Sequence, residues 1–86
     1  MTDSEELFDF PCDFPIKVMG IANHDFETII VEIIHRHIGS LNTVKSRHSN
    51  GGKYMSVTVN FIAQSRVQLD ALYMELTQHE LVKMVL

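Results

Sequence analysis

Apolar and polar residues follow a different spacing in each of six consecutive segments between residues 14 and 86. A spacing of two indicates a strand with one buried face, and spacings of three and four indicate an amphipathic helix. The first segment predicts a strand over residues 16–21. Pro11 and Pro15 predict an extended entry before it, because proline cannot donate a hydrogen bond to a sheet.

The first predicted helix follows three residues that can act as its N-cap: Asn23, His24 and Asp25. Its apolar positions recur at three- and four-residue steps: Phe26, Ile29, Ile30, Ile33, Ile34 and either His37 or Ile38. Gly39 stands where a left-handed backbone ends a helix, and Arg36 and His37 occupy the last turn, where positive charge is favourable. The sequence therefore predicts both ends of this helix.

A hairpin is predicted next, because residues 42–49 alternate weakly, residues 54–62 alternate strictly, and residues 50–52 supply a turn. In the second of these strands, one face carries Met55, Val57, Val59 and Phe61, and the other carries Tyr54, Ser56, Thr58 and Asn60. One apolar and one polar face suit a sheet covered by a single layer of helices.

The second helix is predicted to begin at Ser65, whose spacing from Gln68 matches a capping box. Its apolar stripe is Leu69, Leu72, Tyr73 and Leu76, and residues 80–86 predict a short final strand. The resulting α+β fold is a ferredoxin-like βαββαβ sandwich, with four antiparallel strands in the order 4-1-3-2 and two helices on one face. Lys45 and Arg47 then lie on an edge strand, where charge discourages pairing with another molecule.

The composition, 45% apolar and 21% charged over 86 residues, is typical of an ordinary globular domain. Five carboxylates precede Phe14 without any Lys or Arg, whereas the later residues carry seven bases and six acids. We therefore expect an acidic, partly flexible arm over residues 1–9 and one domain over residues 10–86. A single cysteine and the lack of a long apolar run predict a cytoplasmic protein without a membrane segment.

Neither a metal site nor a catalytic site is predicted. The five histidines, His24, His35, His37, His48 and His79, include no pair spaced by four residues on a helix. Cys12 lies in an acidic, proline-flanked segment without a base that could activate its thiol. Residues 20–24 also lack the arginine with which acylphosphatases of this fold hold phosphate. We expect no enzymatic activity, no metal ion and no cofactor.

Strand alternation predicts which side chains lie on the sheet face without helices: Lys17, Met19, Thr43, Lys45, Arg47, Tyr54, Ser56, Thr58, Lys83 and Val85. Four bases then share this face without a carboxylate. We predict an interaction surface made of Lys17, Met19, Lys45, Arg47, Tyr54 and Lys83. The apolar members suit contact with a protein or with a second copy of this chain, and the basic members suit a polyanion.

Two features qualify these alternatives. RNA-recognition motifs use the same fold and face, but Lys17 stands where a stacking aromatic is needed and only Tyr54 could stack, so nucleic acid comes second to protein. Gly20 either permits a tight exit from the first strand or lets a small ligand approach the backbone, as in amino-acid-sensing ACT domains. Asn23 would be the side-chain partner of such a ligand.

Several segments occur in an order that resembles the YbeD-like family of small bacterial proteins, and the resemblance covers about residues 7–86. They are Phe10-Pro11 with Phe14, Lys17-Val18-Met19-Gly20, Tyr54-x-Ser56-Val57, Leu72-Tyr73-x-Glu75-Leu76 and Val82-Lys83-Met84-Val85-Leu86. The resemblance implies a ferredoxin-like fold similar to ACT regulatory domains and a link to lipoate or glycine-cleavage metabolism. The resemblance identifies no catalytic residues in this chain.

Together these observations predict a small, non-enzymatic module that regulates by contact with another protein, which we expect to be a metabolic enzyme. A small ligand near Gly20 and Asn23 and a homodimer are both compatible with this prediction. The alternative is binding of a nucleic acid or another polyanion through the basic sheet face. The acidic arm would screen that face through its opposite charge.

Overall fold

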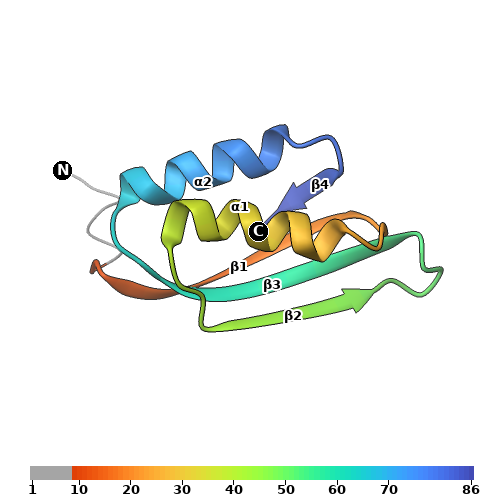
Figure 1. Ribbon diagram of the computed structural model, residues 1–86, viewed down its shortest axis with the longest axis horizontal. Helices are drawn as coiled ribbons and strands as arrows, with labels where there is room; N and C mark the ends of the chain where they lie inside the picture. The colour runs from red at the N-terminus through yellow and green to blue at the C-terminus, as the bar shows by residue number, and fades with distance from the viewer. Residues whose placement is uncertain (1–8) are drawn as a thin grey trace.

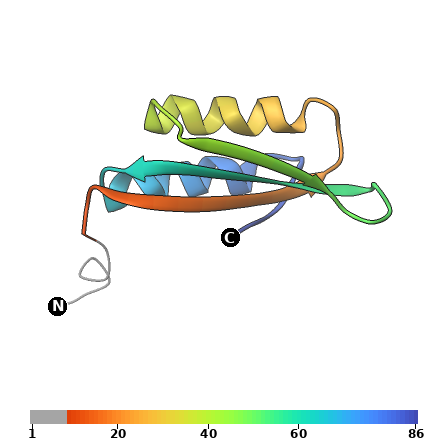
Figure 2. The same cartoon turned by 90° about the horizontal axis from the view of Figure 1, so that it is seen from below.

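The computed structural model describes residues 9–86, a four-stranded antiparallel sheet with two helices on one face (Figure 1). The elements are β1 (Cys12–Ile21), α1 (Phe26–Ile38), β2 (Thr43–His48), β3 (Tyr54–Ala63), α2 (Arg66–Gln78) and β4 (Val82–Val85). The strand order is β2-β3-β1-β4, and the β2–β3 turn projects at one end of the sheet (Figure 2). The predicted ferredoxin-like fold is confirmed. Residues 1–8 of the predicted acidic arm lie outside the described residues.

The first strand is longer than predicted, because β1 begins at Cys12 rather than near Ile16 and pairs with β3 along its whole length. Pro15 does not interrupt this ladder. The N–H of Lys17 donates to the carbonyl of Leu86 on the β4 side, and backbone alternation turns the nitrogen of Pro15 to the same side. The ladder with β4 does not extend to Pro15, so the proline removes no hydrogen bond from the sheet.

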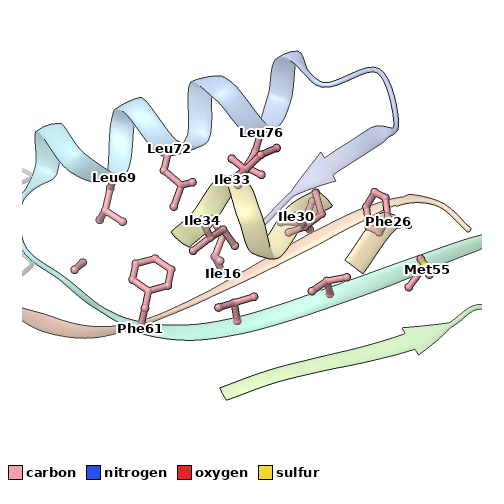
Figure 3. Packing of buried hydrophobic residues seen from close by; sticks show 14 residues of the cluster. Ile16, Phe26, Ile30, Ile33, Ile34, Met55, Phe61, Leu69, Leu72 and Leu76 are labelled. Carbon is pink, nitrogen blue, oxygen red and sulfur yellow. The ribbon is translucent and has the colours of Figure 1, made fainter. Parts of the chain in front are cut away.

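The hydrophobic core fills the space between the sheet and the helices, as Figure 3 shows. It contains Ile16, Val18, Phe26, Ile30, Ile33, Ile34, Met55, Val57, Val59, Phe61, Ala63, Leu69, Leu72 and Leu76. No charged or polar residue among the described part of the chain is buried with them. The predicted inward face of β3 and the main positions of both helix stripes are therefore confirmed.

The ends of α1 follow the sequence signals in part. Gly39 ends the helix with a φ of 98°, a left-handed conformation that glycine adopts without strain, and its N–H donates to the carbonyl of His35. Asp25 occupies the N-cap position but makes no side-chain capping hydrogen bond. Asn23 organises this end instead, because its Oδ1 accepts from the N–H of Asp25 at 2.8 Å.

The N-terminus of α2 is capped by Ser65, whose hydroxyl oxygen accepts from the N–H of Gln68 at 3.1 Å. The return bond differs from the predicted capping box. The Gln68 side chain accepts from the N–H of Gln64 at 2.8 Å, one residue before the cap. Its amide nitrogen then donates to the carbonyl of His37 at 3.1 Å, so this side chain also joins the two helices.

The last strand contains a bulge that strict alternation does not predict. Met84 lies opposite Met19, and the next residue of β1, Gly20, lies opposite Val82. Lys83 stands between Met84 and Val82 and is therefore the extra residue of the bulge. As a result Val82 and Val85 both pack against the core, and Met84 takes the open side. The prediction that Val85 lies on the open face is wrong, because the bulge reverses the alternation in β4.

Candidate interaction surface

The register of the strands shows which side chains meet on the sheet face that carries no helices, here called the open face. One row across the sheet is Arg47, Ser56, Met19 and Met84. The next row is Lys45, Thr58, Lys17 and Leu86, whose last two members exchange backbone hydrogen bonds of 2.8 and 3.1 Å. The open face is therefore basic toward β2 and apolar toward β4.

The basic half consists of Lys17, Lys45 and Arg47, which are all exposed. Lys45 and Arg47 lie two residues apart on one strand, which separates their Cα atoms by about 6.7 Å. Lys17 and Lys45 lie two strands apart, which is roughly 10 Å. Within residues 9–86, none of the three forms an ion pair. Their charge is therefore available to a partner.

Among residues 9–86, one carboxylate side chain, that of Asp13, shares the open face, contrary to the prediction that none does. Asp13 lies there because β1 begins early enough to include it, and it pairs with Ile62 at the far end of the strand. Four residues separate it from Lys17, a distance of about 13 Å along a strand. At physiological ionic strength the Debye length is about 8 Å, so Asp13 neutralises the basic half only weakly.

The apolar half of the open face exposes large hydrophobic side chains. Tyr54 is 44% exposed, Met84 51% and Leu86 59%, and Met19 lies between them and is half-buried. The register places Met84 beside Met19, Leu86 beside Lys17 in the next row, and Tyr54 beside Ile21 in the row on the other side of Met19. Contiguous exposed apolar side chains next to charged ones are typical of surfaces that bind proteins.

Two hollows on the open face join into one trough. The first has a volume of about 170 Å³ and is lined by Lys17, Met19, Arg47, His48, Ser49, Tyr54, Met55 and Ser56. The second has a volume of about 420 Å³ and is lined by Lys17, Lys45, Ser46, Arg47, Ser56 and Thr58. They share Lys17, Arg47 and Ser56. We call this feature the open-face trough: an apolar pocket at Met19 and Tyr54 continued by a polar, basic hollow.

Five of the six predicted surface residues line the trough: Lys17, Met19, Lys45, Arg47 and Tyr54. Lys83 lies apart from them, at the bulge of β4 on the edge of the sheet opposite to β2. Alternation along the sequence missed Met84 and Leu86, which border the apolar half. No local signal reports them, since their orientation depends on the bulge at Lys83.

The other predicted site, Gly20 with Asn23, has structural roles. Gly20 lies on the inner face of β1, where an added Cβ would lie 2.6 Å from the ring of Phe26 and would overlap the carbonyl oxygen of Leu81. Asn23 accepts the N–H of Asp25 and its carbonyl accepts the N–H of Phe26. These contacts account for both residue types without a ligand, and ligand binding by them stays a prediction.

A cluster of charged groups lies on the helix layer. Glu75 of α2 accepts from Arg36 at 2.6 Å and meets the His37 ring nitrogen Nε2 at 2.7 Å, so it joins α2 to the last turn of α1. Hydrogen bonds from Arg36 and then His37 hold the pKa of Glu75 at about 2, below the usual 4.5. The cluster lies among the helices, away from the open face, and fastens one helix to the other.

Two other kinds of feature are absent from the described residues. Within residues 9–86, no three side chains of His, Cys, Asp or Glu are grouped so that they could hold a metal ion. In the same part of the chain, no helix is both long enough and apolar enough to span a membrane. The open-face trough therefore remains the feature on which we base a functional assignment.

The class of protein follows from the fold, an antiparallel β2-β3-β1-β4 sheet beneath two helices. The ACT domain from GTP pyrophosphokinase of Chlorobium tepidum is similar, with a TM-score of 0.69, 15% identity, and coverage of 87% of this chain and 97% of that domain. The C-terminal domain of the MgtC protein from Mycobacterium tuberculosis has a TM-score of 0.73 at 16% identity, covering 92% and 88%. These likenesses show an ACT-like, ferredoxin-like fold.

The family follows from the sequence relatives. Residues 5–86 match the family model described as "Protein of unknown function (DUF493)". A UPF0250 protein of Paraburkholderia phymatum is 49% identical over 85 residues, which is 96% of either chain. A UPF0250 protein of Neisseria gonorrhoeae is 40% identical over the full length of both. The chain belongs to this family, and the YbeD-like resemblance is confirmed.

Proposed function

We propose that this protein is a small, non-enzymatic regulatory module that acts by binding a partner protein through its open face. The observation that carries the proposal is the pairing of exposed apolar side chains, Tyr54, Met84 and Leu86, with cations that form no ion pair within residues 9–86. The ACT-like fold supports a regulatory role, because the family resemblance links that fold to regulation. We place the protein in the cytoplasm, with a metabolic enzyme as its partner.

Several features favour binding over catalysis. The described residues that line the open-face trough include no carboxylate that could orient a general base. Among the described residues, His37 and Glu75 form a closely bonded histidine–carboxylate pair. This pair lies in the helix layer, and Arg36 also binds its carboxylate. The open face does present side chains that are enriched in protein contacts: Tyr54, Met19 and Arg47 in the trough, and Met84 beside it.

A second candidate function is binding of a nucleic acid or another polyanion. The observation that favours it is the set of three cations, Lys17, Lys45 and Arg47, next to one exposed aromatic ring, Tyr54. The two functions differ in their dependence on salt. Binding driven by phosphates weakens steeply as ionic strength rises, whereas an apolar protein contact does not.

Affinity capture with matched variants tests the proposal. The open-face variant carries Tyr54→Ala and Met84→Ser, and the control variant carries Val67→Ser and Met74→Ser, which alter residues of α2 that are 78% and 62% exposed. We expect wild type and control to retain the same stoichiometric protein after nuclease treatment, and the open-face variant to lose it. Equal retention by both variants would contradict the proposal, and nuclease-sensitive material alone would favour the polyanion alternative.

A further inference from the structure

We infer that the open-face trough binds an acidic, extended peptide segment of the partner, with carboxylates over the basic hollow and one apolar side chain in the pocket at Met19 and Tyr54. This inference rests on the proposed function and specifies the chemistry of what is bound. It follows from the charge, the spacing and the shape of the trough.

The charge of the trough calls for carboxylates. Lys17, Lys45 and Arg47 line its basic hollow together with the uncharged Ser46, Ser56 and Thr58. The hydroxyl of Ser46 donates to the carboxylate of Glu27 on α1, because the side chain of Ser46 lies on the covered side of the sheet, opposite Val57. No carboxylate of residues 9–86 forms an ion pair with these cations. An acidic ligand would therefore meet bare positive charge and form charge-assisted hydrogen bonds, which are stronger than neutral ones.

The spacing of the cations suits an extended chain. Lys45 and Arg47 alternate on one strand, with about 6.7 Å between their Cα atoms, and acids at alternate positions of an extended peptide have the same separation. A peptide laid along β2 and β3 could therefore place one carboxylate at each cation. Its next side chain on that face would reach the end of the trough where Tyr54 lies.

The shape of the trough favours a peptide over a small molecule. Sites for small ligands are commonly clefts of about 300–1,000 Å³ that enclose most of the ligand. The apolar pocket here is smaller, at about 170 Å³, and opens onto a face where Tyr54 is 44% exposed, so it accepts one side chain. The basic hollow, at about 420 Å³, has the volume of a small-ligand site. Its three cations are all exposed, however, so it lies open along the sheet and suits an acidic chain segment better than an enclosed small molecule.

Two other occupants fit less well. A second copy that placed its own basic half over the trough would bring the cations of both copies together, because a two-fold contact uses the same patch on both copies. A single-stranded nucleic acid commonly stacks successive bases on several aromatic rings. The trough offers Tyr54 and the imidazole of His48, both at its apolar end, and no ring lines the basic hollow, where a strand of several bases would continue.

The test begins with selection of peptides from a random 12-residue phage library on the immobilised full-length protein. Selected peptides and a 12-nucleotide oligothymidylate are then titrated by fluorescence anisotropy at low and physiological salt. The titrated proteins are wild type, the Lys45→Gln/Arg47→Gln variant, the Tyr54→Ala variant and an Arg66→Gln control, which removes one positive charge from the helix layer. Circular dichroism and size-exclusion chromatography verify that every variant is folded and monodisperse.

We expect the selected peptides to carry acidic residues at alternate positions beside a large apolar residue. The Lys45→Gln/Arg47→Gln variant should bind them about tenfold more weakly, because two exposed ion pairs are lost. Tyr54→Ala should also weaken binding, and Arg66→Gln should leave it unchanged. The oligonucleotide should bind more weakly than the peptides at physiological salt.

Three results would overturn the inference: selected peptides without acidic residues, equal binding by wild type and the Lys45→Gln/Arg47→Gln variant, or tighter binding of the oligonucleotide at physiological salt. The capture experiment separates this failure from failure of the proposed function. If a partner is captured through the open face but the peptides are not acidic, the inference fails and the proposed function stands. If the open-face variant captures the same protein as well as wild type does, the proposed function itself fails.

Discussion

The two faces of the central sheet are built from alternate residues of the same strands, yet they have different tasks. On β1, Ile16 and Val18 are completely buried beneath the helices, whereas Lys17 is exposed and Met19 is half-buried on the open face. The covered face stabilises the fold through apolar burial, which contributes about 1.5–3 kcal/mol for each large side chain. The open face contributes little to stability, and its residues are therefore free to serve recognition.

This contrast explains why the trough can hold exposed apolar side chains and cations without loss of the fold. A mutation on the covered face should change the free energy of unfolding, and one on the open face should change binding. The experiments below test this separation in order of expected effect on stability.

The largest effect is expected from neighbouring residues on β3. Phe61 is fully buried and its ring lies 5.8 Å from that of Phe14, whereas Ile62 is 38% exposed on the open face. Phe61→Ala should lower the free energy of unfolding by about 3–5 kcal/mol, because it removes buried surface and leaves a cavity. Ile62→Ala should cost less than about 1 kcal/mol. Urea denaturation of both variants measures the difference, and similar losses would contradict the separation of the two faces.

A smaller loss in the free energy of unfolding is expected at Gly20, a position on the covered face of β1 that has no side chain. Gly20→Ala would force its Cβ against Phe26 and the carbonyl of Leu81, and such overpacking costs about 1–3 kcal/mol. Gly51→Ala is the matched control, because no atom lies within 4 Å of a Cβ at that turn position. Thermal unfolding compares the two variants. A stable Gly20→Ala protein would show that the close packing at Gly20 is not required.

The smallest effect is expected in the helix layer, from the carboxylate that joins α1 to α2. Glu75 has a folded pKa of about 2, lowered by Arg36 and then by His37, so its stabilisation is complete above pH 4.5. That stabilisation is lost as the pH falls from 4.5 toward 2. The side chain is 36% exposed, and solvent screening limits the effect to about 1 kcal/mol.

The measurement is the difference in unfolding free energy between wild type and Glu75→Gln at several pH values. We expect a difference near neutral pH that shrinks as the solution becomes acidic and as salt is added. A constant difference from pH 7 to pH 2 would show that the bridge between the helices does not stabilise the fold through its charge.

Most of the fold could be predicted from the sequence, because the spacing of hydrophobic residues within a segment indicates which of its faces is buried. Strict alternation from Tyr54 to Ile62 marked β3 and its two faces, and Gly39 and Ser65 marked a helix end and a helix start. Five trough residues followed from the same alternation. This succeeded because β1, β2 and β3 pair without a bulge, so odd and even positions keep their sides.

The remaining features depend on contacts between distant segments. The bulge at Lys83 turned Val85 inward and placed Met84 beside Met19, which local alternation could not indicate because a bulge arises from the pairing of two strands. Pro15 is accommodated within β1 because the ladder with β4 ends before it reaches Pro15. Glu75 and Arg36, on different helices, are brought together by helix packing. The sequence by itself determined the elements and the core, since both depend on local periodicity. Tertiary structure decided the register, the bulge and the trough, because each requires residues far apart in the chain to lie side by side.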